Sequence, residues 1–139
     1  MNNTKSRLHN VFFYGLYMDP DILASKAVAP RAPRIGFAAG YRLRIGNMAT
    51  LLRDETSQAH GIVYSLTHEE IDTLYAKAGL DMCVSESLLV TLDSGENIPT
   101  LCKNLRLPPE ESESNADYEA KLVQCMVQLK VPTTHISNV

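Results

Sequence analysis

The stretch that decides the fold is Gly61-Ile62-Val63-Tyr64-Ser65-Leu66-Thr67-His68-Glu69-Glu70. Every second residue from Ile62 to Leu66 is apolar or aromatic, and this period of two predicts a strand over 61–66. Thr67 and Glu70 then form a capping box: the threonine hydroxyl accepts from the Glu70 N–H, and the glutamate reaches back. A strand should therefore pass directly into a helix.

The helix that follows is predicted by apolar spacing. Ile71, Leu74, Tyr75 and Ala78 fall on one helical face, and Gly79 is typical of a C-terminal cap.

The remaining segments predict more strands than helices, which favours an α+β domain built on a small mixed sheet or β-barrel. We expect one domain over 1–139, with 1–9 and 132–139 as tails. A bulge or a sharp bend is expected at Gly40. Further strands are expected over 11–15, 35–45, 48–52, 84–92 and 98–105, a polar turn over 54–57, and helices after Asp19 and from Ser114 or Asn115 to Pro132.

Composition narrows the classes of function. The chain has 139 residues, a net charge of −3, 6% aromatic residues and no tryptophan, which argues against a nucleic-acid partner. No apolar run approaches the roughly 20 residues that span a bilayer, so we expect no membrane partner. Met1–Asn10 lacks the apolar region of a secretory signal, and Cys83, Cys102 and Cys125 lie in apolar settings. These features predict reduced thiols and a cytoplasmic protein.

Histidine spacing gives little support for a metal site. No two of the four histidines lie at i, i+4, and the pair His68 and Asp72 supplies only two ligands. We expect no metal and no cofactor.

A second informative stretch is Val11-Phe12-Phe13-Tyr14-Gly15-Leu16-Tyr17-Met18-Asp19-Pro20. A strand, a glycine and a helix start in succession can present backbone N–H groups to an anion. An ordinary turn, in which Gly15 supplies a positive φ, explains the same residues. Both interpretations stay open on local chemistry.

Two carboxylates are the most informative once the capping residues and the solvated runs are set aside. They are Asp81 and Glu86, and Glu86 begins an apolar strand. A strand would direct Glu86 either to solvent or into the barrel. If it points inward, its pKa would be raised and it would be the leading general-base candidate.

Taken together, these segments resemble the γ-glutamyl cyclotransferase-like family. The loop at 14–18 is similar to the family's Y-G-S-N-L or Y-G-T-L-M loop, and 61–70 is similar to its G-x-V-Y-x-L-T-x-E-E segment. The helix ending at Ala78-Gly79 and the terminal helix with Tyr118 and Val131-Pro132 complete the match, which covers nearly the whole chain.

The resemblance implies a small mixed β-barrel with flanking helices and a cavity beside the glycine loop. It implies substrate-binding roles for Tyr14, Gly15, Leu16, Tyr17 and Met18. The family's reaction needs no cofactor. A glutamate takes a proton from the α-amino group of a γ-glutamyl substrate, and the amine attacks the γ-carbonyl, releasing an amine and 5-oxoproline.

Two positions depart from the family pattern. Ala78 aligns with the catalytic glutamate, and Leu16 replaces a polar residue of the loop. Two functions therefore stay open. One is a γ-glutamyl cyclotransferase whose base is relocated to Glu86 or Asp81. The other is a non-catalytic relative that binds a small anionic metabolite or a protein partner. The oligomeric state is not predicted.

Overall fold

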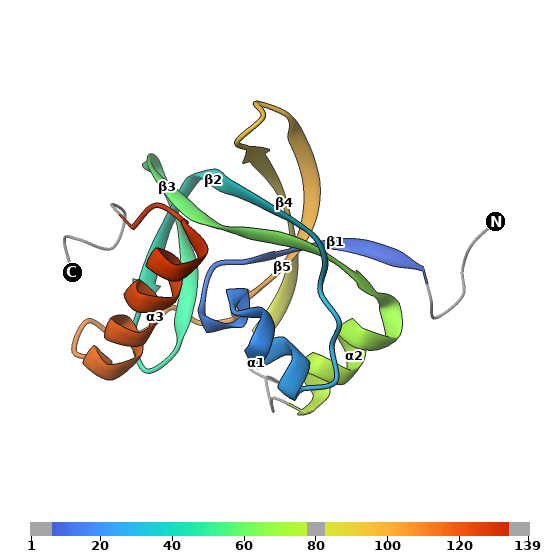
Figure 1. Cartoon of the computed structure of the whole chain (residues 1–139). Helices are drawn as coiled ribbons and strands as arrows, with labels where there is room; N and C mark the ends of the chain where they lie inside the picture. Colours follow the sequence, from blue (N-terminus) through green and yellow to red (C-terminus); the bar gives the residue numbers. More distant parts are fainter. Residues whose placement is uncertain (1–6, 78–82, 134–139) are drawn as a thin grey trace.

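The computed structural model describes residues 7–77 and 83–133. Its centre is a closed five-stranded barrel with the strand order β1-β3-β2-β4-β5 (Figure 1). The expected α+β fold with a small mixed β-barrel is confirmed. The strands are β1 (Leu8–Phe13), β2 (Arg31–Ile45), β3 (Ala49–Thr67), β4 (Cys83–Leu92) and β5 (Asn97–Leu105); the helices are α1 (Pro20–Ser25), α2 (His68–Lys77) and α3 (Ala116–Leu129), with a 3-10 turn η1 at Leu16–Met18.

Strand β1 closes the barrel. It runs antiparallel to β3 along its whole length and meets β5 in parallel at Val11 and Leu101. All other neighbouring strands are antiparallel, which makes the barrel mixed. Because β1 begins at Leu8, the expected tail over 1–9 is too long by two residues.

Strand β3 is continuous from Ala49 to Thr67, so the expected polar turn over 54–57 is wrong as a break between strands. The Asp54 carboxylate accepts hydrogen bonds from the N–H and hydroxyl of Thr56 and from the hydroxyl of Ser57. These local bonds explain the turn-like sequence. Pairing with β2 on both sides of them keeps the strand intact.

An irregularity in strand pairing is present at Gly40, where a bulge or a sharp bend was expected, and the extra residues lie on β3. Five steps along β3, from Arg53 to Gln58, lie opposite two steps along β2, from Ala39 to Tyr41. Gly40 lies at this register shift with φ +85°, a conformation that favours glycine. The bulge bends the long β2–β3 pair, as closure of a small barrel requires.

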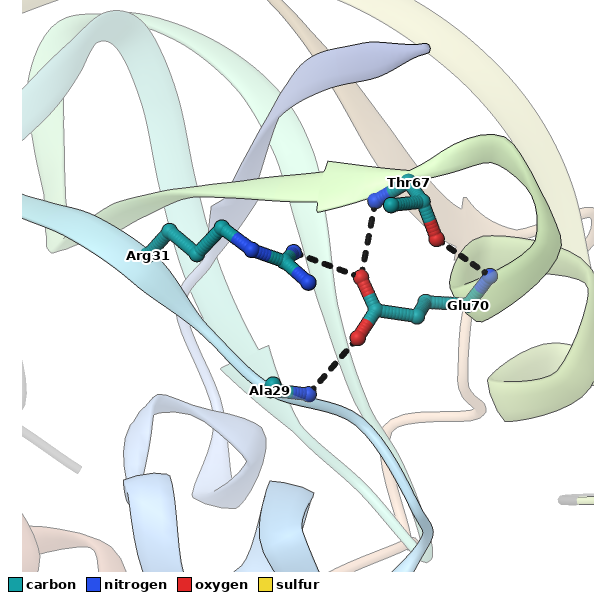
Figure 2. Close-up of polar contacts among 4 residues, drawn as sticks. All are labelled: Ala29, Arg31, Thr67 and Glu70. Carbon is teal, nitrogen blue, oxygen red and sulfur yellow. Dashed lines mark hydrogen bonds and ion pairs between the residues drawn. The ribbon is translucent and has the colours of Figure 1, made fainter. Parts of the chain in front are cut away.

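The capping box connects two distant parts of the chain (Figure 2). The Thr67 hydroxyl accepts from the Glu70 N–H at 3.1 Å, and the Glu70 carboxylate accepts from the Thr67 N–H at 2.8 Å. The same carboxylate accepts from the Ala29 N–H at 2.8 Å and pairs with Arg31 at 2.7 Å. Desolvation raises the pKa of Glu70, but these hydrogen bonds outweigh it and lower the pKa to about 2.

The core combines the barrel interior with the inner face of α3. Figure 1 shows α3 beside the β2–β3 hairpin. Leu122, Cys125 and Met126 are buried on its inner face, as the apolar stripe of this helix predicts. In the described ranges, no helix has the length and apolar character needed to cross a membrane.

Candidate functional site

A cavity of about 380 Å³ lies where the loop after β1 meets the helices and the β2–β3 turn. Its size is at the lower end of the range for small-molecule pockets. Six segments form its walls. They are residues 12–17; Ile22 in α1 with Lys26 just after it; Asn47, Met48 and Ala49 at the β2–β3 turn; Tyr75 of α2; Lys103 of β5; and Tyr118 of α3.

Gly15 is required by close packing. Its φ of −114° and ψ of −157° are extended backbone, so the interpretation that it supplies a positive φ is wrong. A Cβ at this position would lie 2.4 Å from the Tyr118 hydroxyl oxygen. The missing side chain therefore lets α3 approach the loop.

Tyr118 connects α3 to this loop. Its own N–H is capped by the Asn115 side chain at 3.0 Å, which fixes the start of the helix. Its hydroxyl oxygen accepts from the Leu16 N–H at 3.1 Å. Burial raises the pKa of Tyr118, and the bond from Leu16 only partly opposes this. The phenol is therefore neutral near pH 7, and its O–H proton can be donated.

Two backbone N–H groups of the loop already have acceptors, so fewer are free to bind an anion than the anion-cradle interpretation requires. The Leu16 N–H is taken by Tyr118, and the Met18 N–H donates to the Gly15 carbonyl at 3.0 Å. Among the described residues, none accepts from the Tyr17 N–H. Met18 is fully buried and does not line the cavity, whereas the other four predicted loop residues do.

The charged groups on the cavity wall are cationic. Lys26 and Lys103 are half-buried, and the Lys103 ammonium lies 5.1 Å from the centre of the Tyr75 ring. The lining of the described structure contains no aspartate or glutamate. Neither lysine forms an ion pair with a carboxylate of residues 7–77 or 83–133. The wall is therefore complementary to an anion.

Glu86 is exposed on β4 and is not part of the cavity wall. Its carboxylate accepts from the Asn104 side-chain amide at 2.9 Å. The Asn104 carbonyl oxygen in turn accepts from the Tyr14 hydroxyl at 2.9 Å. Among the described residues, Glu86 is linked to the cavity wall through Asn104 and Tyr14. The other general-base candidate, Asp81, lies outside the described residues, as does Ala78, and the catalytic roles of Glu86 and Asp81 stay predictions.

Within the two described ranges, no three His, Cys, Asp or Glu side chains cluster closely enough to hold a metal ion. His68 and Asp72 lie 3.6 Å apart on the exposed face of α2.

No protein-family model and no curated protein matches the chain. Solved structures do: a γ-glutamyl cyclotransferase superposes with a TM-score of 0.77 at 15% identity, covering 95% of this chain and 86% of the other. The chain has the γ-glutamyl cyclotransferase-like fold. A glutathione-specific γ-glutamyl cyclotransferase from yeast shares this fold with a TM-score of 0.62 at 14% identity, covering 87% of each chain. An AIG2-like protein from Mus musculus gives 0.60 at 13% identity, covering 84% of this chain and 94% of the other.

The wall residues that sequence reasoning missed include Lys26, Tyr75 and Lys103. A signal for Lys103 exists, because Cys102 and Asn104 are buried and strand alternation places Lys103 on the opposite face. Lys26 follows a helix of only six residues, which has no clear periodicity. The sequence pattern places Tyr75 on the apolar face of its helix, and only the three-dimensional structure brings it beside Lys103.

Proposed function

We propose that the cavity binds a small carboxylate metabolite related to γ-glutamyl compounds, without the glutamate-based catalysis known from this fold. The observation that carries this proposal is the wall chemistry: two lysines and no carboxylate among its described residues. An anionic ligand is favoured there, whereas proton abstraction from an amine is not.

The polar groups of the wall suggest how such a ligand is held. A carboxylate would pair with Lys103 or Lys26 and accept from the Tyr17 N–H and the Tyr118 hydroxyl. Phe13, Met48 and the other apolar side chains would contact the methylene groups of the ligand.

The described residues of the wall include no carboxylate that could replace a catalytic glutamate. Burial raises the pKa of both Tyr17 and Tyr118, and Tyr118 is the more deeply buried of the two. Both phenols therefore stay protonated at neutral pH. Loss of a general base typically costs about 10²–10⁴ in rate. Binding with little or no turnover is therefore the expected behaviour.

Titration calorimetry with γ-glutamyl-alanine and 5-oxoproline tests this function, together with an assay for 5-oxoproline release. We expect saturable binding of at least one compound, loss of affinity in Lys103→Gln, and no release above the rate without protein. Binding of neither compound would remove the proposal. Rapid release of 5-oxoproline would replace it with the catalytic alternative.

That alternative is a cofactor-independent γ-glutamyl cyclotransferase with a relocated base. It is favoured by the fold and by the hydrogen-bonded chain from Glu86 through Asn104 to Tyr14. If it holds, the wild-type chain releases 5-oxoproline, and Glu86→Gln or Asp81→Asn abolishes the release. Undiminished release in both variants would exclude a relocated base at these positions.

The proposed localisation is the cytoplasm, where the protein would encounter a small metabolite of this kind. The free thiols of Cys102 and Cys125, both buried, support it.

A further inference from the structure

We infer that the preferred ligand is a carboxylate that carries no protonated amine, so that amine-free compounds bind more tightly than zwitterions of the same shape. This inference rests on the proposed function and narrows its ligand class. It is carried by the balance of donors and acceptors around the cavity.

The charged side chains among the described wall residues are donors only. Lys26 and Lys103 each bring an ammonium group with three N–H donors and no acceptor. Both ammonium groups lack a carboxylate partner among the described residues. An anion entering the cavity would satisfy them, whereas a ligand ammonium would add a third positive charge.

Three oxygen atoms of the loop and of its α3 partner already accept a hydrogen bond. The Gly15 carbonyl accepts from the Met18 N–H at 3.0 Å, and the Leu16 carbonyl accepts from the Asp19 N–H at 3.0 Å. The Tyr118 oxygen accepts from the Leu16 N–H. A ligand ammonium needs up to three acceptors once it leaves water, and an unpaired buried charge is strongly disfavoured.

A γ-glutamyl compound is a zwitterion at neutral pH, because its α-amino group is protonated. Acetylation of that amine, or its incorporation into a lactam as in 5-oxoproline, removes the positive charge and keeps the carboxylate. The same cavity should therefore discriminate between these two states of otherwise similar molecules.

Two matched pairs of ligands test the inference by titration calorimetry at pH 7.5. They are N-acetyl-γ-glutamyl-alanine against γ-glutamyl-alanine, and 5-oxoproline against proline. We expect the amine-free member to bind about tenfold more tightly or better, a difference of about 1.4 kcal/mol. Lys103→Gln and Lys26→Gln should each reduce this preference. Lys121→Gln, which removes an exposed lysine on α3 outside the cavity, is the matched control and should leave it unchanged.

Equal or tighter binding of the zwitterions would overturn the inference while leaving the proposed function intact. A preference for the zwitterions that disappears in Asp81→Asn would also overturn it and would assign an acceptor role to Asp81. Absence of binding by all four compounds would remove the proposed function itself, so the two failures are distinguishable.

Discussion

At the scale of single residues, the Tyr118 hydroxyl occupies the space that a side chain at position 15 would need. In Gly15→Ala the new methyl group would lie 2.4 Å from the Tyr118 hydroxyl oxygen, and 3.7 Å from the ring carbon that carries it. We expect Gly15→Ala to cost about 1–3 kcal/mol of unfolding free energy, as overpacking does. Tyr118→Phe should cost about 1 kcal/mol, because the Leu16 N–H loses its acceptor.

The double variant separates this clash from a general loss of packing. Without the hydroxyl, the methyl group at position 15 makes an ordinary contact, so Gly15→Ala with Tyr118→Phe should cost less than the sum of the single changes. Chemical denaturation of all four proteins measures the coupling, which we expect to be about 1 kcal/mol or more. Additive costs would show that the close approach has no energetic role.

Glu70 predicts a pH dependence of stability. Its pKa falls from 4.5 to about 2 on folding, which corresponds to about 3 kcal/mol at 1.36 kcal/mol per unit. Because the folded pKa is the lower one, this contribution is fully present above pH 4.5. It is lost as the pH falls through the interval from 4.5 to 2.

The variant Glu70→Gln removes the titrating group and keeps the size of the side chain. The stability difference from wild type, measured by urea denaturation, should be largest above pH 5 and should shrink towards pH 2. Glu69→Gln is the neighbouring control and should show no such trend, since Glu69 is exposed. A difference for Glu70→Gln that does not change with pH would contradict the assigned role.

At the scale of elements, Glu113 holds the segment before α3 against the β2–β3 turn. Its carboxylate accepts from the Asn47 N–H at 3.1 Å and from the Glu110 N–H at 3.0 Å. Glu113→Ala should therefore reduce the hydrogen-exchange protection of both amides and loosen the cavity wall at Asn47. Glu111→Ala is the control for a nearby exposed carboxylate. Unchanged exchange at Asn47 in Glu113→Ala would exclude this attachment.

The elements show which parts of the fold follow from sequence. The capping box of Thr67 and Glu70 is local, so its spacing predicted the junction between β3 and α2. The two further partners of Glu70, Ala29 and Arg31, lie about 40 positions earlier, and no local pattern indicates them. The continuity of β3 through Asp54 was missed for the same reason, because local hydrogen bonds resemble a turn while distant pairing maintains the strand.

At the scale of the whole molecule, Asn104 connects four segments and is only 2% exposed. Its side chain donates to Glu86 of β4 and accepts from Tyr14 and, at 3.2 Å, from the Leu51 N–H of β3. Asn104→Ala would remove the side-chain acceptor of the Leu51 N–H and one of the two acceptors near the Tyr14 hydroxyl, and should cost about 1–3 kcal/mol. Thermal and urea unfolding measure this cost.

Asn104→Asp gives a control of nearly identical shape. Its second carboxylate oxygen would face Glu86, so one of the two groups should have a raised pKa. The variant should therefore be closest to wild type at low pH and should lose relative stability as the pH rises through that pKa. A cost independent of pH would show that Glu86 does not contact position 104 in solution.

The candidate site as a whole was predictable only in part. The loop over 14–17 was placed on the cavity wall from its own sequence and the family resemblance. Lys26 and Lys103, which determine the charge of the wall, lie 77 positions apart on α1's C-terminal end and on β5. Both lysines line the same cavity because the barrel closes. Closure depends on the order of all the strands, so neither local sequence indicates that the two residues share a wall.

The contact between Leu16 and Tyr118 spans 102 positions of the chain. During synthesis the loop emerges 102 positions before its tyrosine partner, which follows the five described strands. At a synthesis rate of about 5–20 residues per second, several seconds pass between synthesis of the loop and synthesis of Tyr118. A nascent chain stalled before α3 could therefore form much of the barrel, yet it should capture no ligand, so ligand capture would report that translation has passed the final helix.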